Sequence, residues 1–146
     1  MKFCKLLFLL FISSNGVAQS TKDSIAIAQL IIADYKTLGN WDLERHLQNC
    51  TKDYILIENG EIQTLADESE YFKKNAARVI SRTDTFNFRR ITIINSIAYA
   101  VYNLQSTIVE KGVAKKYHWS ESVVCTKINK EWKIALLHST SLVSKN

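Results

Sequence analysis

Hydrophobic residues recur at helical spacing in the segment that begins near residue 23. Ile25, Ala28, Ile32 and Tyr35 lie three or four positions apart, which places their side chains on one face of an α-helix. The pattern predicts a helix over residues 23–38. Because further apolar residues widen this stripe, we expect the helix to pack against a large surface.

Two more helices are predicted in the first half of the chain. Asn40 is a suitable N-cap for a second helix over residues 41–48. Thr64 is followed three positions later by Asp67, which is the spacing of a capping box. This pair predicts a third helix that runs to about residue 80.

The remaining segments have strand patterns. Residues 54–58 form an apolar strand, and Asn59-Gly60 after it is the strongest short signal for a hairpin turn. Four longer apolar segments, each bounded by turn residues, follow at residues 83–94, 97–109, 113–128 and 131–142. Long strands joined by tight turns predict an antiparallel meander.

The order of these elements predicts the fold class. Three helices and a hairpin precede the four long strands, which indicates a single α+β domain with its helices on one face of a sheet. Strands of this length must twist and curl, and a curled sheet that is covered by helices encloses a cavity.

The N-terminal segment has the pattern of a secretory signal peptide. Lys2 and Lys5 form a basic region, residues 6–12 form a short apolar core, and small residues precede Gln19. We expect residues 1–18 to be cleaved during export. Residues 19–146 would then be the mature domain, in the periplasm or outside the cell.

Charge and hydropathy argue against two classes of partner. The chain carries a formal net charge of +5, and loss of Lys2 and Lys5 with the signal peptide leaves +3. The basic residues are scattered, whereas a nucleic-acid-binding surface needs a dense basic stripe. No stretch approaches the ~20 apolar residues of a membrane span. We therefore expect neither a nucleic-acid partner nor a transmembrane helix.

The cysteines and histidines show no metal-binding pattern. Cys50 and Cys125 remain in the mature chain. Export permits a disulfide between them, and free buried cysteines are the alternative. Their spacing fits no metal motif, and His46, His118 and His138 lie on separate predicted elements. The sequence therefore predicts no metal site and no cofactor.

The last two strands carry polar residues that are candidates for chemistry. By strand alternation His138 shares a face with Trp132, and Glu121 shares a face with Trp119 and Val123. A histidine titrates near neutral pH, and a partly buried glutamate can have a raised pKa, so both can act as general bases. The alternatives are a histidine satisfied by a neighbouring hydroxyl and a glutamate that is ion-paired or exposed.

The order of elements and three short motifs resemble the nuclear transport factor 2-like superfamily. The motifs are Glu121-Ser122, Trp132-Lys133-Ile134 and His138-Ser139, and their spacing is similar to that of SnoaL-like polyketide cyclases and of the hub domains of calcium/calmodulin-dependent kinase. The resemblance covers residues 23–142. It implies a cone-shaped fold in which three helices pack on a strongly curved antiparallel sheet.

The resemblance also implies a pocket. Ketosteroid isomerases have a general-base aspartate near the position of Glu58, for which an exposed hairpin residue is the alternative here. They also have a tyrosine at the position of Ile32. Hub domains have arginines at the positions of Asn103 and Val123. These departures argue against isomerase chemistry and against the acidic ligands that paired arginines would grip.

Further candidate ligand-binding residues lie on the strands. Asn103 can hydrogen-bond a neutral polar ligand, or it can pair with polar neighbours on the sheet surface. Aromatic and apolar residues are expected to line the cavity. The candidates of this kind are Tyr54, Tyr99, Trp119 and Val123.

Three functions fit these observations. The first is an exported domain that binds a small, partly apolar ligand. The second is a cofactor-independent enzyme, isomerase- or cyclase-like or a hydrolase-like lyase, with His138 or Glu121 as general base and Glu58 as a weaker candidate. The third is an assembly module that forms a homodimer through the outer face of the sheet, as relatives of this superfamily do.

Overall fold

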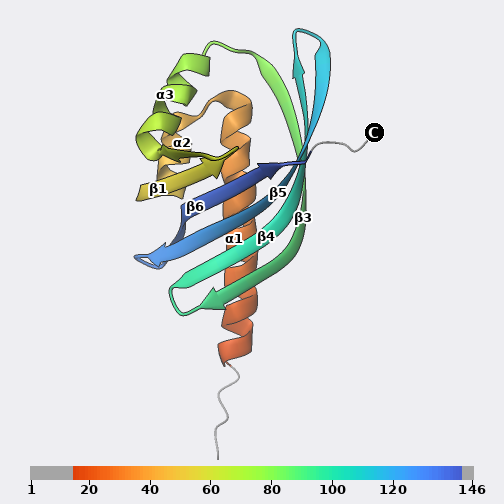
Figure 1. The fold of residues 1–146 in the computed structure, drawn as a ribbon. Coiled ribbons are helices and arrows are strands. Elements are labelled where there is room, and N and C mark those ends of the chain that lie inside the picture. Colours follow the sequence, from red (N-terminus) through yellow and green to blue (C-terminus); the bar gives the residue numbers. More distant parts are fainter. Residues whose placement is uncertain (1–14, 143–146) are drawn as a thin grey trace, which may run out of the picture.

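The computed structural model describes the backbone of residues 15–142 and the side chains of residues 21–142. Its helices are α1 (Asn15–Asn40), α2 (Leu43–Asn49) and α3 (Leu65–Asn75), and its strands are β1 (Cys50–Glu58), β2 (Glu61–Thr64), β3 (Ile80–Ile94), β4 (Ile97–Glu110), β5 (Val113–Ile128) and β6 (Glu131–Ser141). The α+β prediction is confirmed (Figure 1). None of the described helices is long and apolar enough to cross a bilayer.

The predicted signal peptide falls mostly outside the described residues. Residues 1–14 are not described, and α1 already includes residues 15–18 and the proposed cleavage point before Gln19. Cleavage at that point therefore stays a prediction.

The strands form one curved sheet in the order β2-β1-β6-β5-β4-β3. The four long strands are the expected antiparallel meander. The β1–β2 hairpin joins it through a parallel pairing of β1 with β6, so the sheet is mixed and not wholly antiparallel. The reason is the path of the chain: it crosses to the far edge at β3, and the meander then brings β6 back beside β1 in the same direction (Figure 1).

Several helix boundaries differ from the prediction. The first helix begins at Asn15 and ends at Asn40, and so extends beyond residues 23–38 at both ends. Asp42, and not Asn40, is the N-cap of α2, and Trp41 before it has a φ of 57°, which is outside the helical region. The third helix ends at Asn75. The Trp41 indole Nε1 donates to the Arg78 carbonyl at 2.9 Å, which fixes the short connection that leads from α3 into β3.

The core lies between α1 and the concave face of the sheet. Ile27 and Ile31 on α1 are fully buried there, together with the small residues Ala98 and Ala100 on β4. The core continues through Tyr54, Leu56, Tyr102, Leu104, Val123, Cys125, Trp132 and Ile134. This packing fills one end of the cone and leaves the other end for a cavity.

Cys50 and Cys125 are free thiols, and both are buried. The structure therefore has the free-cysteine alternative and not the disulfide. Burial raises the pKa of the Cys125 thiol to about 12, which keeps it protonated and unreactive.

Candidate functional site

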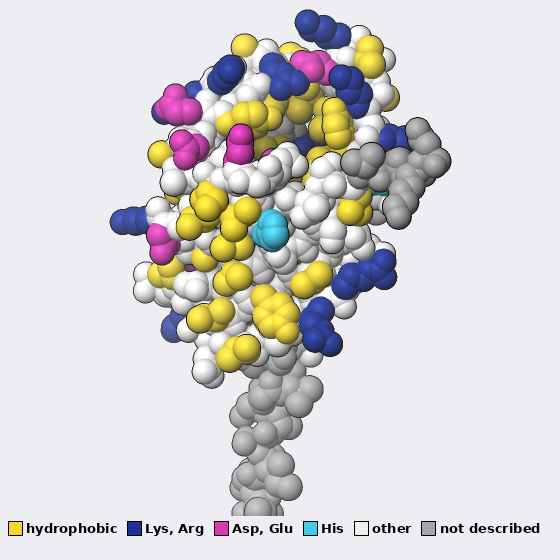
Figure 2. Space-filling view, viewed as in Figure 1, with side chains coloured by type: hydrophobic (Ala, Val, Ile, Leu, Met, Phe, Trp, Pro, Cys, Tyr) yellow, Lys and Arg dark blue, Asp and Glu magenta, His cyan; other side chains and the backbone are white. Residues whose placement is uncertain are grey.

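A cavity of about 750 Å³ lies between the helices and the concave face of the sheet. Its mouth is between α3 and the β4–β5 hairpin, and Figure 2 shows a hollow there with hydrophobic side chains in its wall and charged side chains around it. Aromatic and apolar residues form much of the lining, among them Trp41, Tyr54, Leu104, Ile108, Trp119 and Leu137. A cavity of this size and character is typical of small-molecule sites.

Glu121 is the most deeply buried carboxylate in the cavity wall, at 4% exposure. The Tyr35 hydroxyl lies 2.7 Å from both of its carboxylate oxygens, and the Ser139 hydroxyl donates to Oε1 at 2.8 Å. Burial raises the pKa of Glu121 although these hydroxyls oppose the shift. The structure thus places Glu121 on the inner face of the sheet, without an ion pair among the described residues.

Tyr35, three residues beyond Ile32, supplies the hydroxyl that contacts Glu121. It lies on α1, and burial raises its pKa well above the ordinary value for tyrosine. The phenol therefore stays protonated and can donate to Glu121. The Arg82 guanidinium lies over the ring at 5.3 Å, and the Phe86 ring packs edge-on at 5.4 Å. These contacts hold the hydroxyl in place.

The positive charge of Arg82 is balanced by a carboxylate on β3, and its guanidinium also contacts a hydroxyl on β4. Its Nε contacts Asp84 at 2.9 Å and its second guanidinium nitrogen donates to the Ser106 hydroxyl at 3.1 Å. Ser106 donates in turn to Asp84. Arg82 therefore has its carboxylate partner, Asp84, outside the cavity. Among the described residues, Glu121 forms no ion pair with a basic side chain.

Glu58 lines the same cavity and is half-buried. The alternative of a fully exposed hairpin residue is thereby excluded. Burial raises its pKa, while the Arg82 charge and the Trp119 side chain oppose the rise. Trp119 lines the wall beside it and stacks on Tyr117 with ring centroids 5.5 Å apart. Tyr54 also lines the cavity, as predicted.

His138 lies on the opposite face of the sheet from Glu121, contrary to the prediction. Val124 pairs with Leu136 and Cys125 with Ile134, so Ala135 is an extra residue in β6. This bulge reverses the alternation beyond it. Ser139 and Leu137 consequently face the cavity, whereas His138 is exposed. His138 and Glu121 cannot act on one shared ligand.

Three of the remaining candidates do not line the cavity. Tyr99 and Asn103 lie on the outer face of β4, since the buried residues of that strand are at the alternate positions. Asn103 Oδ1 accepts from Arg89 Nε at 3.2 Å, which is the surface pairing considered as its alternative. Val123 faces inward but is buried in the core at 1% exposure.

A second polar cluster in the cavity wall was missed by the sequence analysis. Asp34, His46 and Glu68 come from α1, α2 and α3, all three line the cavity, and all three are buried. His46 Nδ1 lies 3.0 Å from Asp34 Oδ1, and Asn49 Nδ2 donates to the same oxygen at 3.1 Å. One signal was available: Asp34 follows Ile31 by three positions on the buried stripe of the helix.

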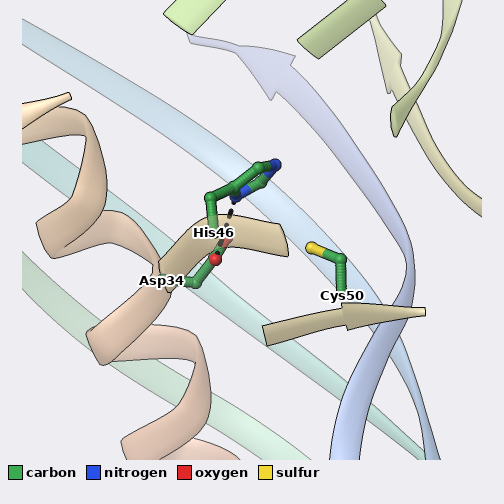
Figure 3. A group of neighbouring side chains, drawn as sticks. All are labelled: Asp34, His46 and Cys50. Carbon is green, nitrogen blue, oxygen red and sulfur yellow. Dashed lines mark hydrogen bonds and ion pairs between the residues drawn. The ribbon is translucent and has the colours of Figure 1, made fainter. Parts of the chain in front are cut away.

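Asp34, His46 and Cys50 are also the described residues that could hold a metal ion, since their donor atoms lie within 4.8 Å of one another. Figure 3 shows the Asp34–His46 contact with the Cys50 sulfur directed toward it. Nitrogen, oxygen and sulfur donors of this kind suit zinc. In this structure Asp34 Oδ1 is already occupied by its two hydrogen-bond donors, and burial raises the pKa of Cys50 far above its ordinary value. The arrangement is that of a hydrogen-bonded cluster.

No protein-family model matches the chain, and no curated protein matches its sequence. Solved structures do match. A conserved protein from Planctomyces limnophilus has a TM-score of 0.70 at 16% identity, over 84% of this chain and 98% of that one. A ketosteroid isomerase-like protein from Erwinia carotovora has a TM-score of 0.68 at 13% identity, over 84% and 98%.

The association domain of C. elegans CaMKII matches with a TM-score of 0.68 at 16% identity, over 83% of this chain and 97% of that one. At such identities the likeness shows the fold alone. The chain therefore has the cone fold of nuclear transport factor 2-like and ketosteroid isomerase-like proteins, which supports the resemblance seen in its sequence.

Proposed function

We propose that the protein is an exported small-molecule-binding domain whose cavity takes a small, partly apolar ligand. The observation that carries the proposal is the buried Glu121 carboxylate, held by the Tyr35 and Ser139 hydroxyls in the wall of an aromatic cavity of about 750 Å³. Burial of a carboxylate without a basic partner costs free energy. That cost is understandable where the group serves a ligand.

A thermal-shift screen of a fragment library tests this proposal. Ile108 lines the cavity and Thr107 beside it points to the other face of β4. Ile108→Trp should narrow the cavity and reduce the shifts, and Thr107→Trp should preserve them as the matched control. A library without hits, or hits whose shifts the two variants leave equally unchanged, would contradict the proposal.

Cofactor-independent proton transfer is a second candidate, and the raised pKa of Glu121 favours it. A carboxylate whose pKa is raised by burial is a stronger base, and Tyr35 could donate to developing negative charge on a substrate. His138 has no part in this candidate. Exchange of solvent deuterium into a ketone probe, lost in Glu121→Gln, would be the expected sign of such activity.

Homodimer formation through the outer face is a third candidate. Four residues that pair with one another across neighbouring strands form an apolar row on this face: Tyr99, Val124, Leu136 and Ile55. All four are partly exposed, and Figure 2 shows hydrophobic side chains on this side of the molecule. Light scattering should give twice the mass of the mature chain, and Val124→Lys should return the monomer. A monomer at high concentration would contradict a dimer.

Export is the remaining part of the proposal, and it is supported by the basic and apolar pattern of residues 1–18. Intact mass measurement of the protein recovered from the periplasm or medium should give a chain that begins at Gln19. A chain that stays in the cytoplasm and keeps Met1 would contradict export.

A further inference from the structure

The cavity has a second polar wall where its three helices meet, separate from Glu121. Asp34 fixes the orientation of the His46 ring through Nδ1 at 3.0 Å. The ring stacks on Phe72 at 4.8 Å and meets the edge of Tyr54 at 5.8 Å. With Nδ1 bonded to Asp34 and the ring packed against Phe72 and Tyr54, Nε2 is the ring nitrogen that has no hydrogen-bond partner among the described residues, although it is buried. It faces Glu68 in the cavity wall.

His46 Nε2 and Glu68 Oε2 lie 3.6 Å apart, which is longer than the ~2.7–3.2 Å of an N–H···O hydrogen bond. The His46 side chain is 3% exposed, and among the described residues Nε2 has no hydrogen-bond partner. Buried polar atoms are rarely left in this condition. A ligand donor placed beside the pair, within hydrogen-bond distance of both atoms, would satisfy Nε2 and the Glu68 carboxylate together.

Neighbouring charges and burial shift the pKa values of His46 and Glu68. Burial raises the pKa of Glu68 to about 7; the His46 charge opposes the rise, and the negative charges of Asp34 from α1, Glu58 from β1 and Asp67 from α3 add to it. Burial lowers the pKa of His46, but the hydrogen bond and charge of Asp34 and the charge of Glu68 raise it overall. Both shifts are upward, so the His46–Glu68 pair retains a proton to higher pH than a separate histidine and glutamate would.

We propose that this pair is an ammonium subsite: a primary amine on an apolar or aromatic body binds with its N–H groups beside His46 Nε2 and the Glu68 carboxylate, within hydrogen-bond distance of both. The ammonium replaces the proton that the pair retains, and that proton passes to the solvent. An ammonium has three donors, which can satisfy both acceptors. Tyr71, which also lines the cavity, offers a ring that attracts a cation, whereas the Trp41 ring already has the Arg78 guanidinium over it at 5.5 Å. The inference rests on the proposed function and names the ligand class of that cavity.

Calorimetry with three probes of one shape tests the subsite. The probes are 2-phenylethylamine, 2-phenylethanol and 3-phenylpropionate, titrated at pH 7 in phosphate and in Tris, whose ionisation enthalpies differ. The amine should bind at least tenfold more tightly than the alcohol. Only the amine should show a buffer-dependent enthalpy that corresponds to proton release, approaching one proton per amine.

Glu68→Gln removes the exchangeable proton at nearly constant shape. It should weaken amine binding at least tenfold and abolish proton release, while the affinity for the alcohol stays within twofold. Glu70→Gln is the matched control, because Glu70 lies on the same helix, is exposed and pairs with Lys73. Proton release by the unmodified protein tests the inference even if the Glu68 variant folds poorly.

The outcomes separate this inference from the proposed function. If the alcohol binds and the amine binds no more tightly, or if the acid binds best, the ammonium subsite is overturned and the proposed function stands. Amine binding without proton release also overturns it. If none of the three probes binds at millimolar concentration and the fragment screen gives no hits, the subsite and the proposed function both fail.

Discussion

Tyr35 and Glu121 lie 86 residues apart in the chain, and the Tyr35 hydroxyl contacts both oxygens of the Glu121 carboxylate at 2.7 Å. The contact joins α1 to the middle of β5 across the cavity wall. It supports the fold because it satisfies a buried carboxylate, and it positions that carboxylate for a ligand. Ser139, which donates to the same group from β6, adds a third element to the cluster.

Tyr35→Phe should therefore destabilise the protein by ~1–3 kcal/mol, the cost of leaving a buried acceptor with one donor fewer. The pKa of Glu121 should rise further, because a hydrogen bond that lowers it is lost. Urea denaturation and a carboxyl NMR titration measure the two effects. Tyr117→Phe is the control, because Tyr117 is 38% exposed. Equal stabilities of the two variants would contradict the role given to Tyr35.

The free energy of unfolding should fall as the pH rises from ~5 to ~8. The native pKa values of Glu58, Glu68 and Glu121 are raised, that of Glu68 to about 7 from an unfolded value of 4.5. The native state then holds protons that the unfolded state has lost, so stability declines through this window. The raised pKa of His46 acts in the same direction above its ordinary value of 6.5.

Thermal melts at intervals of pH measure this slope. Glu68→Gln should flatten it, because the amide cannot ionise and the largest resolved carboxyl shift is removed. A stability that rises between pH 5 and pH 8, or a slope that Glu68→Gln leaves unchanged, would contradict the assigned protonation of the cavity.

His138→Ala should leave stability within ~0.5 kcal/mol of the original, as is usual for exposed positions. It should also leave ligand affinity unchanged, because His138 lies on the face opposite the cavity. Ser139→Ala, one residue along, removes a donor to Glu121 and should weaken both. Calorimetry on the two variants makes the comparison. A larger loss of binding from the His138 change would show that the Ala135 bulge is misplaced.

Thr64→Ala should cost ~1 kcal/mol, the typical effect of removing an N-cap. The Thr64 hydroxyl accepts from the Asp67 backbone N–H at 3.4 Å, and the Asp67 carboxylate accepts from the Thr64 backbone N–H at 2.8 Å. Thr64→Ser keeps the hydroxyl and should keep most of the stability. Chemical denaturation distinguishes the two, and equal losses would mean that the capping box contributes nothing.

The sequence predicted the type and order of most elements because the signals for them are local. Asn59-Gly60, the Thr64–Asp67 pair and the turn residues between the long strands each specify a short segment. The pairing of β1 with β6 depends on where distant segments meet, and no local signal specifies it. The third helix was predicted too long, since the Trp41–Arg78 contact that fixes its exit joins residues far apart in the chain.

The site was less predictable, for two physical reasons. One extra residue, Ala135, exchanges the two faces of β6, and strict alternation therefore placed His138 where Ser139 lies. Asp34 on α1 and His46 on α2 can be buried because their side chains hydrogen-bond to each other. Polar residues of this kind appear as surface positions in sequence until a partner from another element is known. Glu121 was predictable because its neighbours on β5 are apolar on the same face.

A crystal structure of the protein with the tightest ligand from the fragment screen is the most direct test of ligand binding in the cavity. We expect the ligand to occupy the cavity between α3 and the β4–β5 hairpin, with a polar atom within hydrogen-bond distance of Glu121 or Glu68 and its apolar part against Trp119 or Trp41. A ligand bound instead on the outer face beside His138 and Asn103, with the cavity unchanged, would contradict it.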